Sequence, residues 1–161
     1  MVLFSWDDLQ TFTWAFFVVM PIVAFIHAFG HVFFIFLFGG KADLNVGRGR
    51  KILSLGRMHF FILYFIDAAC QYTDIKREKR WKHALIYGGG IIFNGLTIFI
   101  VNTLITQGIW PESQFFYQLV YFSLYYIFFS LLPVDYGKDN PSDGRAIYLA
   151  LRYGYSFKEV E

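Results

Sequence analysis

The stretch TFTWAFFVVMPIVAFIHAFGHVFFIFLFGG, residues 11–40, decides how this chain folds, because nearly all of its residues are apolar or aromatic. A membrane-spanning helix needs about 20 mainly apolar residues. The stretch therefore predicts a span over about 13–38, ended by Gly39 and Gly40. Two histidines, His27 and His31, lie within it, and polar side chains at such a depth usually mark a functional site.

The rest of the chain has the same character. Of its 161 residues, 57% are hydrophobic and only 16% are charged, against roughly 25% charged residues in a typical soluble domain. Such a composition predicts a single integral-membrane domain over residues 1–161. The one cysteine, Cys70, excludes an internal disulfide.

Two further apolar stretches predict spans over about 84–105 and 115–132. The segment between the first two spans is glycine-containing and rich in β-prone residues, which predicts a small membrane-associated β-hairpin over about 44–66. A C-terminal helix is expected over about 143–153. The expected fold is an all-α membrane protein with three transmembrane helices and this one hairpin.

The positive charges are distributed unevenly along the chain. Ten of the fourteen Lys and Arg residues lie between Lys41 and His83, and the other four follow Pro133. The N-terminal segment and the link over 106–114 have none. Because cytoplasmic loops carry the excess of Lys and Arg, we expect a plasma-membrane protein with its N-terminus outside and its C-terminus cytoplasmic. The basic residues then contact the lipid bilayer, and no nucleic-acid partner is expected.

The spacing of the two histidines indicates a metal site. Residues i and i+4 of an α-helix lie on the same face, about 6 Å apart along the axis, so His27 and His31 can bind one ion. Zinc binds neutral imidazole nitrogen at about 2.0 Å. Four alternatives remain: hydrogen bonds between helices, the lining of a polar cavity, a metal carrier, or a haem protein.

A catalytic zinc site needs a third protein ligand and an open position. The sequence after the third predicted span offers Asp135, Asp139 and Asp143. The first two lie in a polar turn that we expect to be solvated. Asp143 follows Asn140 and Pro141, whose turn chemistry would hold one carboxylate at a fixed depth.

Taken together, these motifs resemble the site-2 protease family of intramembrane zinc metalloproteases, in its minimal core form. That family carries His-Glu-x-x-His on its first core helix and Asn-Pro-x-x-Asp-Gly near its third; this chain has HAFGH at 27–31 and NPSDG at 140–144, with one residue instead of two between Pro141 and Asp143. Two weaker matches are GIIFN at 90–94, where Ile91 replaces a proline, and GRG at 47–49.

The resemblance implies a role for each of these positions. His27, His31 and Asp143 would bind zinc. Asn94 would face the site and help to orient the substrate backbone or its oxyanion. The strand around Gly47, Arg48 and Gly49 would pair with an unwound substrate segment; by itself this motif could equally be a turn.

One departure from the family pattern bears directly on chemistry. Ala28 stands where the family has its general-base glutamate, and a methyl group cannot transfer a proton. General acid–base catalysis supplies about 10²–10⁴-fold in rate, so hydrolysis by this chain should be very slow. We interpret the chain as an inactive Glu-to-Ala form of an intramembrane zinc metalloendopeptidase; the alternative is a natural pseudoprotease that binds transmembrane helices without cutting them.

The resemblance also implies the partners. The substrate would be a single-pass membrane protein or a remnant peptide, cut near the cytoplasmic face in regulated intramembrane proteolysis. A regulatory membrane partner or a homo-oligomer is compatible with the same pattern.

Overall fold

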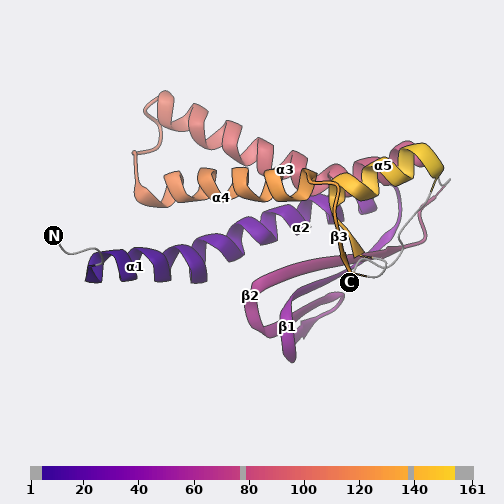
Figure 1. The fold of residues 1–161 in the computed structure, drawn as a ribbon, viewed down its shortest axis with the longest axis horizontal. Helices are drawn as coiled ribbons and strands as arrows, with labels where there is room; N and C mark the ends of the chain where they lie inside the picture. Colours follow the sequence, from indigo (N-terminus) through magenta and orange to yellow (C-terminus); the bar gives the residue numbers. More distant parts are fainter. Residues whose placement is uncertain (1–4, 77–78, 138–139, 155–161) are drawn as a thin grey trace.

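The computed structural model describes residues 5–76, 79–137 and 140–154, which form a bundle of long helices with a sheet beside one end (Figure 1). In chain order the elements are α1 (Trp6–Trp14), the π-helical turn η1 (Ala15–Val19), α2 (Met20–Leu37), β1 (Lys41–Leu55), β2 (Met58–Thr73), α3 (Arg80–Thr106), α4 (Gln114–Leu131), β3 (Asp135–Gly137), β4 (Asn140–Pro141) and α5 (Asp143–Tyr153).

The expectation of an all-α fold with three membrane spans is wrong on both points. The strands β1 and β2 contain 15 and 16 residues, so the domain is mixed α and β. Within the described part of the chain, two helices are long and apolar enough to cross a membrane by length and composition: Trp6–Leu37 and Arg80–Thr106. The third predicted span falls on α4, whose tyrosine, glutamine and serine residues lower its mean hydropathy.

The first long helix is continuous through α1, η1 and α2, and its π-helical turn lies just before Pro21. Proline has no N–H to donate to the carbonyl four residues earlier, which here belongs to Phe17. The Tyr64 hydroxyl of β2 donates a hydrogen bond to that carbonyl at 3.2 Å. The irregular turn thus attaches the sheet to the helix.

The sheet is larger than the hairpin expected over about 44–66. β1 and β2 pair in an antiparallel register that runs from Lys41 opposite Thr73 to Leu55 opposite Met58. Residues 44–46 lie opposite both 58–60 and 68–70, because the two strands bend and make a sheet three strands across.

Two glycines allow the bend in β1. Gly47 and Gly49 have φ values of +90° and +93°, a region that side chains with a Cβ rarely adopt. A Cβ at Gly47 would also approach the backbone of Tyr64 to within 2.6 Å. The GRG motif is therefore neither a regular strand nor a terminal turn, but an irregular segment inside β1.

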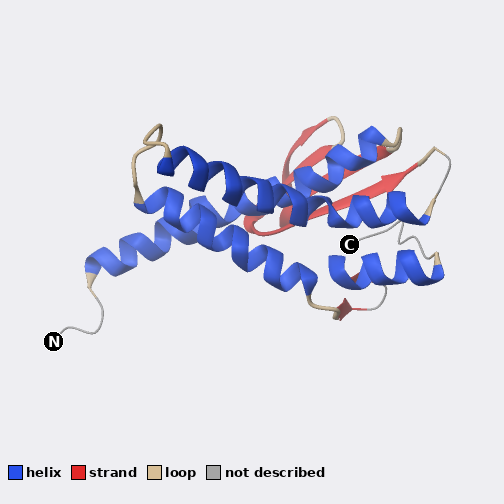
Figure 2. Ribbon diagram, turned by 90° about the horizontal axis from the view of Figure 1, so that it is seen from above, coloured by secondary structure: helices blue, strands red, loops and turns tan. Residues whose placement is uncertain are grey.

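Two apolar clusters lie at opposite ends of the helices. The sheet-side cluster fills the space between α2, α3, α5 and the sheet; its largest members are Ile35, Leu44, Tyr72, Ile86 and Tyr87. The far cluster joins the first long helix to α3 and α4 through Val19, Val23, Val101 and Leu119. Figures 1 and 2 show α4 running back along α3, and α5 beside α3 at the same end as the sheet.

Candidate metal centre

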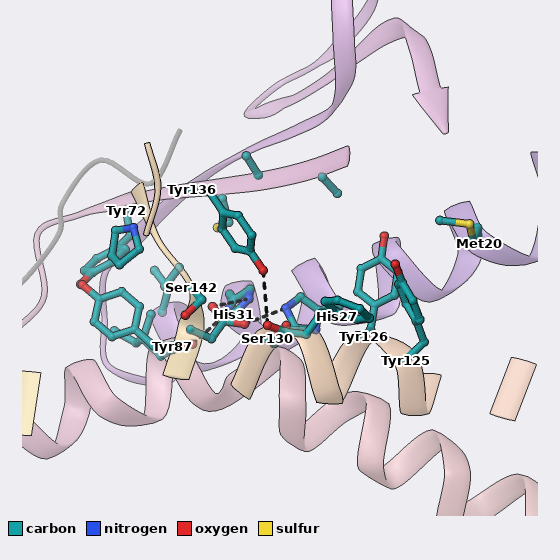
Figure 3. A pocket seen from close by; sticks show the side chains of 18 of the residues that line it. Met20, His27, His31, Tyr72, Tyr87, Tyr125, Tyr126, Ser130, Tyr136 and Ser142 are labelled. Carbon is teal, nitrogen blue, oxygen red and sulfur yellow. Dashed lines mark hydrogen bonds and ion pairs between the residues drawn. The ribbon is translucent and has the colours of Figure 1, made fainter. Parts of the chain in front are cut away.

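Three side chains that the sequence singled out meet at the sheet end of the bundle. His27 and His31 come from α2, and Asp143 is the first residue of α5. His27 Nε2 lies 2.9 Å from Asp143 Oδ2, and His31 Nε2 lies 3.7 Å from Asp143 Oδ1. One ligand atom from each residue lies within 4.8 Å of the other two. Figure 3 shows the two imidazoles side by side at a cavity wall.

The two distances between histidine nitrogen and aspartate oxygen, 2.9 and 3.7 Å, are close to those of a zinc site. Two ligand atoms on a tetrahedral zinc, each about 2.0–2.1 Å from the ion, are about 3.3 Å apart. Two imidazoles and a carboxylate are ligand types that zinc prefers, and three protein ligands leave a fourth position open. The residues present therefore fit this metal.

Glycines let α2 and α3 cross closely at this point. A Cβ on Gly30 would collide with the Gly89 carbonyl, and a Cβ on Gly89 would collide with the Gly30 carbonyl. A Cβ on Gly90 would meet the His27 ring itself. Small residues allow such close approach between membrane helices, and here they create the space that the His27 imidazole occupies.

Each imidazole also makes a contact with α3 through its other ring nitrogen. His31 Nδ1 donates a hydrogen bond to the Ile86 carbonyl at 2.7 Å, which leaves Nε2 as the nitrogen that can bind a metal. Asn94 is fully buried, and its amide nitrogen lies 3.3 Å from His27 Nδ1. The structure thus places Asn94 behind His27, on the side of the ring away from Asp143.

A cap at the start of α5 sets the position of Asp143. Ser142 is the N-cap: its Oγ accepts a hydrogen bond from the Arg145 N–H at 3.2 Å and donates one to the Leu132 carbonyl. The Ser142 N–H donates to the Val134 carbonyl at 2.9 Å. Ser142 thus joins the end of α4 to the start of α5.

The charge of Asp143 is favoured by its surroundings. Burial alone would raise the pKa of its carboxyl, but the electrostatic interaction with His31 and the hydrogen bond from His27 outweigh burial and hold the pKa below its ordinary value. The N-terminus of α5 adds a further interaction favourable to a negative charge.

The other two aspartates considered from the sequence do not join this cluster in the described structure. The Asp135 carboxylate is exposed and lies 3.6 Å from Arg145 Nε. Asp139 lies outside the described residues.

A cavity of about 550 Å³ opens beside the three candidate ligands. The sheet contributes Arg48 and the segment 68–70 to its wall, and α4 contributes Phe129 and Ser130. Tyrosines surround it on several sides (Figure 3): Tyr72, Tyr87, Tyr125, Tyr126 and Tyr136. Of the three GRG residues, Arg48 reaches this wall, whereas Gly47 and Gly49 shape the strand behind it.

Ala28 lies beside this centre but belongs to the apolar core. It is fully buried and packs in the sheet-side cluster with residues such as Ile35 and Leu44. The position that carries the general base in a site-2 protease is thus occupied by a small side chain in apolar surroundings.

Sequence reasoning missed several residues that support this centre. The run Gly88-Gly89-Gly90 was a signal for close helix packing, and Ser142 directly before Asp143 was a signal for an N-cap. His83, at the start of α3, is also buried. The Tyr72 hydroxyl lies 2.9 Å from His83 Nδ1 and 2.7 Å from the Tyr87 hydroxyl, contacts that no local pattern predicts.

Comparison with known proteins connects the chain to a membrane protein. It is 46% identical over 156 residues to the uncharacterized membrane protein YwmF of Bacillus subtilis (strain 168), a match that covers 97% of this chain and 98% of the relative. This chain belongs to the YwmF family. As a member, it is a membrane protein, in agreement with its two long apolar helices. No protein-family model matches the chain, and no solved structure matches it.

Proposed function

We propose that this chain is a zinc-binding membrane protein of the site-2 protease type, which holds an unwound segment of a membrane-spanning substrate beside the metal. With alanine at position 28, it binds such a segment without rapid cleavage. The observation that supports the proposal best is the convergence of His27, His31 and Asp143, whose ligand atoms lie within 4.8 Å of one another although 112 residues separate His31 from Asp143.

The three residues would hold zinc, and bound zinc polarises a carbonyl and lowers the pKa of its water. The chain's own contribution is to hold the metal-binding side chains in position. The Ile86 carbonyl orients the His31 ring, and the Ser142 cap fixes the carboxylate of Asp143 at the helix start. These contacts would keep the donors in place before the metal arrives.

The cavity suits an extended peptide segment. Its volume of about 550 Å³ falls in the usual range of roughly 300–1,000 Å³ for ligand sites. A helical peptide bond is shielded by its own hydrogen bonds, so a transmembrane substrate must unwind first. The segment 68–70 of β2 lies in the cavity wall, where a strand can offer replacement partners to an unwound backbone. The substrate class is therefore a single-pass membrane protein or a remnant peptide.

The proposal has two forms, a protease form and a binding form, which differ in the residue that the working protein needs at position 28. The protease form needs a glutamate there as general base, and the chain would then be the inactive form of a zinc metalloendopeptidase. The binding form keeps alanine as its working residue. The burial of Ala28 in the sheet-side cluster favours the second form, because a carboxylate placed there loses water contacts without gaining an ion partner.

The test compares two variants of equal size. Ala28→Glu supplies a base, whereas Ala28→Gln has the same volume and cannot accept the proton. Both are reconstituted in lipid vesicles with a panel of single-pass reporter proteins. Cleavage by Ala28→Glu alone, with retained zinc, supports the protease form. No cleavage by either zinc-loaded variant supports the binding form, provided that the wild-type protein retains the reporters. A wild-type protein that holds no zinc overturns both.

The basic residues suggest an orientation in the plasma membrane. The sheet carries Lys41, Arg48, Arg50, Lys51 and Arg57, while α1 carries only acidic charges. With the positive side facing the cytoplasm, the N-terminus lies outside and the sheet lies inside. A membrane-impermeant maleimide should label Ser5→Cys in intact cells and Ser54→Cys only after lysis, in a Cys70→Ala background. The reverse pattern would refute this orientation.

A further inference from the structure

Asn94 is the one buried amide side chain in contact with a candidate metal ligand among the described residues. It lies in α3 and has no exposed surface. Its Nδ2 lies 3.3 Å from His27 Nδ1. Its Oδ1 is also buried, and no hydrogen-bond donor among the described residues reaches it. The amide nitrogen of Asn94 is therefore hydrogen-bonded, whereas its amide oxygen has no partner among the described residues.

The hydrogen bonds around His27 correspond to one state of its ring. His27 Nε2 donates to Asp143 Oδ2 at 2.9 Å, so Nδ1 is free to accept the N–H that Asn94 donates. A metal ion bound by His27 changes which ring nitrogen must carry the proton. It needs the Nε2 lone pair, so the ring proton must be on Nδ1, and that N–H needs an acceptor.

We propose that Asn94 is a positioning residue that serves both states by turning its amide over. This inference rests on the proposed zinc site. With metal bound, the Asn94 Oδ1 takes the place of Nδ2 and accepts the His27 Nδ1–H. The amide oxygen and nitrogen occupy nearly the same volume, so the exchange requires rotation of one terminal group and no movement of α2 or α3.

The surroundings leave little freedom for another arrangement. The His27 ring lies directly against Gly90, one turn before Asn94 on α3, so the ring cannot retreat from the amide. An asparagine offers both a donor and an acceptor. An ionised aspartate offers only acceptors, and a leucine of similar size offers neither. The three residue types should therefore affect metal binding in different directions.

The test measures zinc affinity of the full-length protein in detergent by competition with a chelator, and the visible absorption of bound Co²⁺. Asn94→Asp should bind zinc about 10-fold more tightly, because a carboxylate favours the ring tautomer that zinc needs. Asn94→Leu should bind it about 10- to 100-fold more weakly, the usual effect of losing an outer-shell partner. Its Co²⁺ spectrum should also change. Asn102→Leu, at an exposed position on the same helix, is the matched control and should leave both readouts unchanged.

The outcomes are distinguishable. If the wild-type protein binds no zinc, the proposed function fails, and this inference fails with it. If the wild-type protein binds zinc and neither Asn94 variant changes the affinity, the proposed function stands and the role of Asn94 is overturned. A purely structural amide would lower thermal stability in both variants without moving their affinities in opposite directions. If Asn94→Leu does not fold, the zinc affinity of Asn94→Asp still tests the inference. An Asn94→Asp protein that binds zinc no more tightly than the wild type overturns it.

Discussion

The two ends of the helix bundle are held together by different means. At the sheet end, glycines bring α2 and α3 into backbone contact, and His27, Asn94 and Asp143 interact across three helices. At the far end, the same helices meet through Val19, Val23, Val101 and Leu119. Polar contacts depend on direction, whereas apolar packing depends mainly on volume. The comparison teaches that the candidate metal centre depends on backbone geometry at one end, and that the other end is held by apolar packing.

The largest effect is expected where a side chain would enter the space of His27. Gly90→Val places carbon atoms in the His27 ring position, and we expect zinc affinity to fall by more than 100-fold. Gly95 lies on the same helix, and a Cβ there meets nothing within 4 Å. Gly95→Ala should therefore keep zinc and raise helix stability by about 0.5–1 kcal/mol. Zinc affinity and thermal unfolding should be measured in detergent for Gly90→Val and Gly95→Ala. Equal zinc affinities for the two variants would refute the close crossing of α2 and α3.

A smaller effect should follow from removing a helix cap at each end. Ser142 caps α5 beside the centre, and Ser113 caps α4 far from it by accepting a hydrogen bond from the Phe116 N–H at 3.5 Å. Each substitution by alanine should cost about 0.5–2 kcal/mol of stability. Only Ser142→Ala should also weaken zinc binding, by several-fold, because it releases Asp143. A loss of zinc affinity in Ser113→Ala would show that the two ends are not independent.

Removing apolar volume at the far end should affect stability alone. Val101 is buried in the far cluster, and Val101→Ala should lower the free energy of unfolding by about 1–2 kcal/mol. Zinc affinity should stay within about 2-fold of the wild type. Titration of zinc into the purified variant checks this, and a marked loss would mean that the far cluster positions α2 for metal binding.

The smallest response is expected from the cysteine in the cavity wall. Burial, with a minor contribution from Asp43, raises the pKa of the Cys70 thiol to about 12. Because the thiolate is the reactive form, Cys70 in the folded protein should react very slowly with N-ethylmaleimide at pH 7 and faster as pH rises towards 12. Mass spectrometry follows the reaction, with protein unfolded in denaturant as the control. Rapid reaction of the folded protein at pH 7 would contradict the burial of this strand.

The sequence was most informative where the relevant residues are close in the chain. His27 and His31 share a helix face by spacing alone, and the turn before Asp143 distinguishes it from Asp135 and Asp139. How Asp143 comes to lie against the histidines could not be derived, because it depends on the Ser142 cap, on Gly144 packing against the Leu131 carbonyl, and on α5 packing against α3.

Two features of the fold, α4 and the sheet, differ from the prediction. The stretch that forms α4 suggests a span because it is rich in Phe, Leu and Tyr, although each tyrosine carries a hydroxyl. The sheet was expected to be a short hairpin because local β propensity says little about strand length or about bends such as those at Gly47 and Gly49. Asn94 was expected to face the site, and its amide nitrogen lies 3.3 Å from His27 Nδ1; which side of the His27 ring it would contact does not follow from spacing.

Zinc content of the purified protein tests the central claim most directly. Wild-type protein should carry about one zinc ion per chain, and Asp135→Ala, which removes an exposed carboxylate from the neighbouring strand, should keep it. Asp143→Ala should lose most of the metal. Wild-type protein without zinc after purification in a zinc-containing buffer, or full zinc content in Asp143→Ala, would contradict the account.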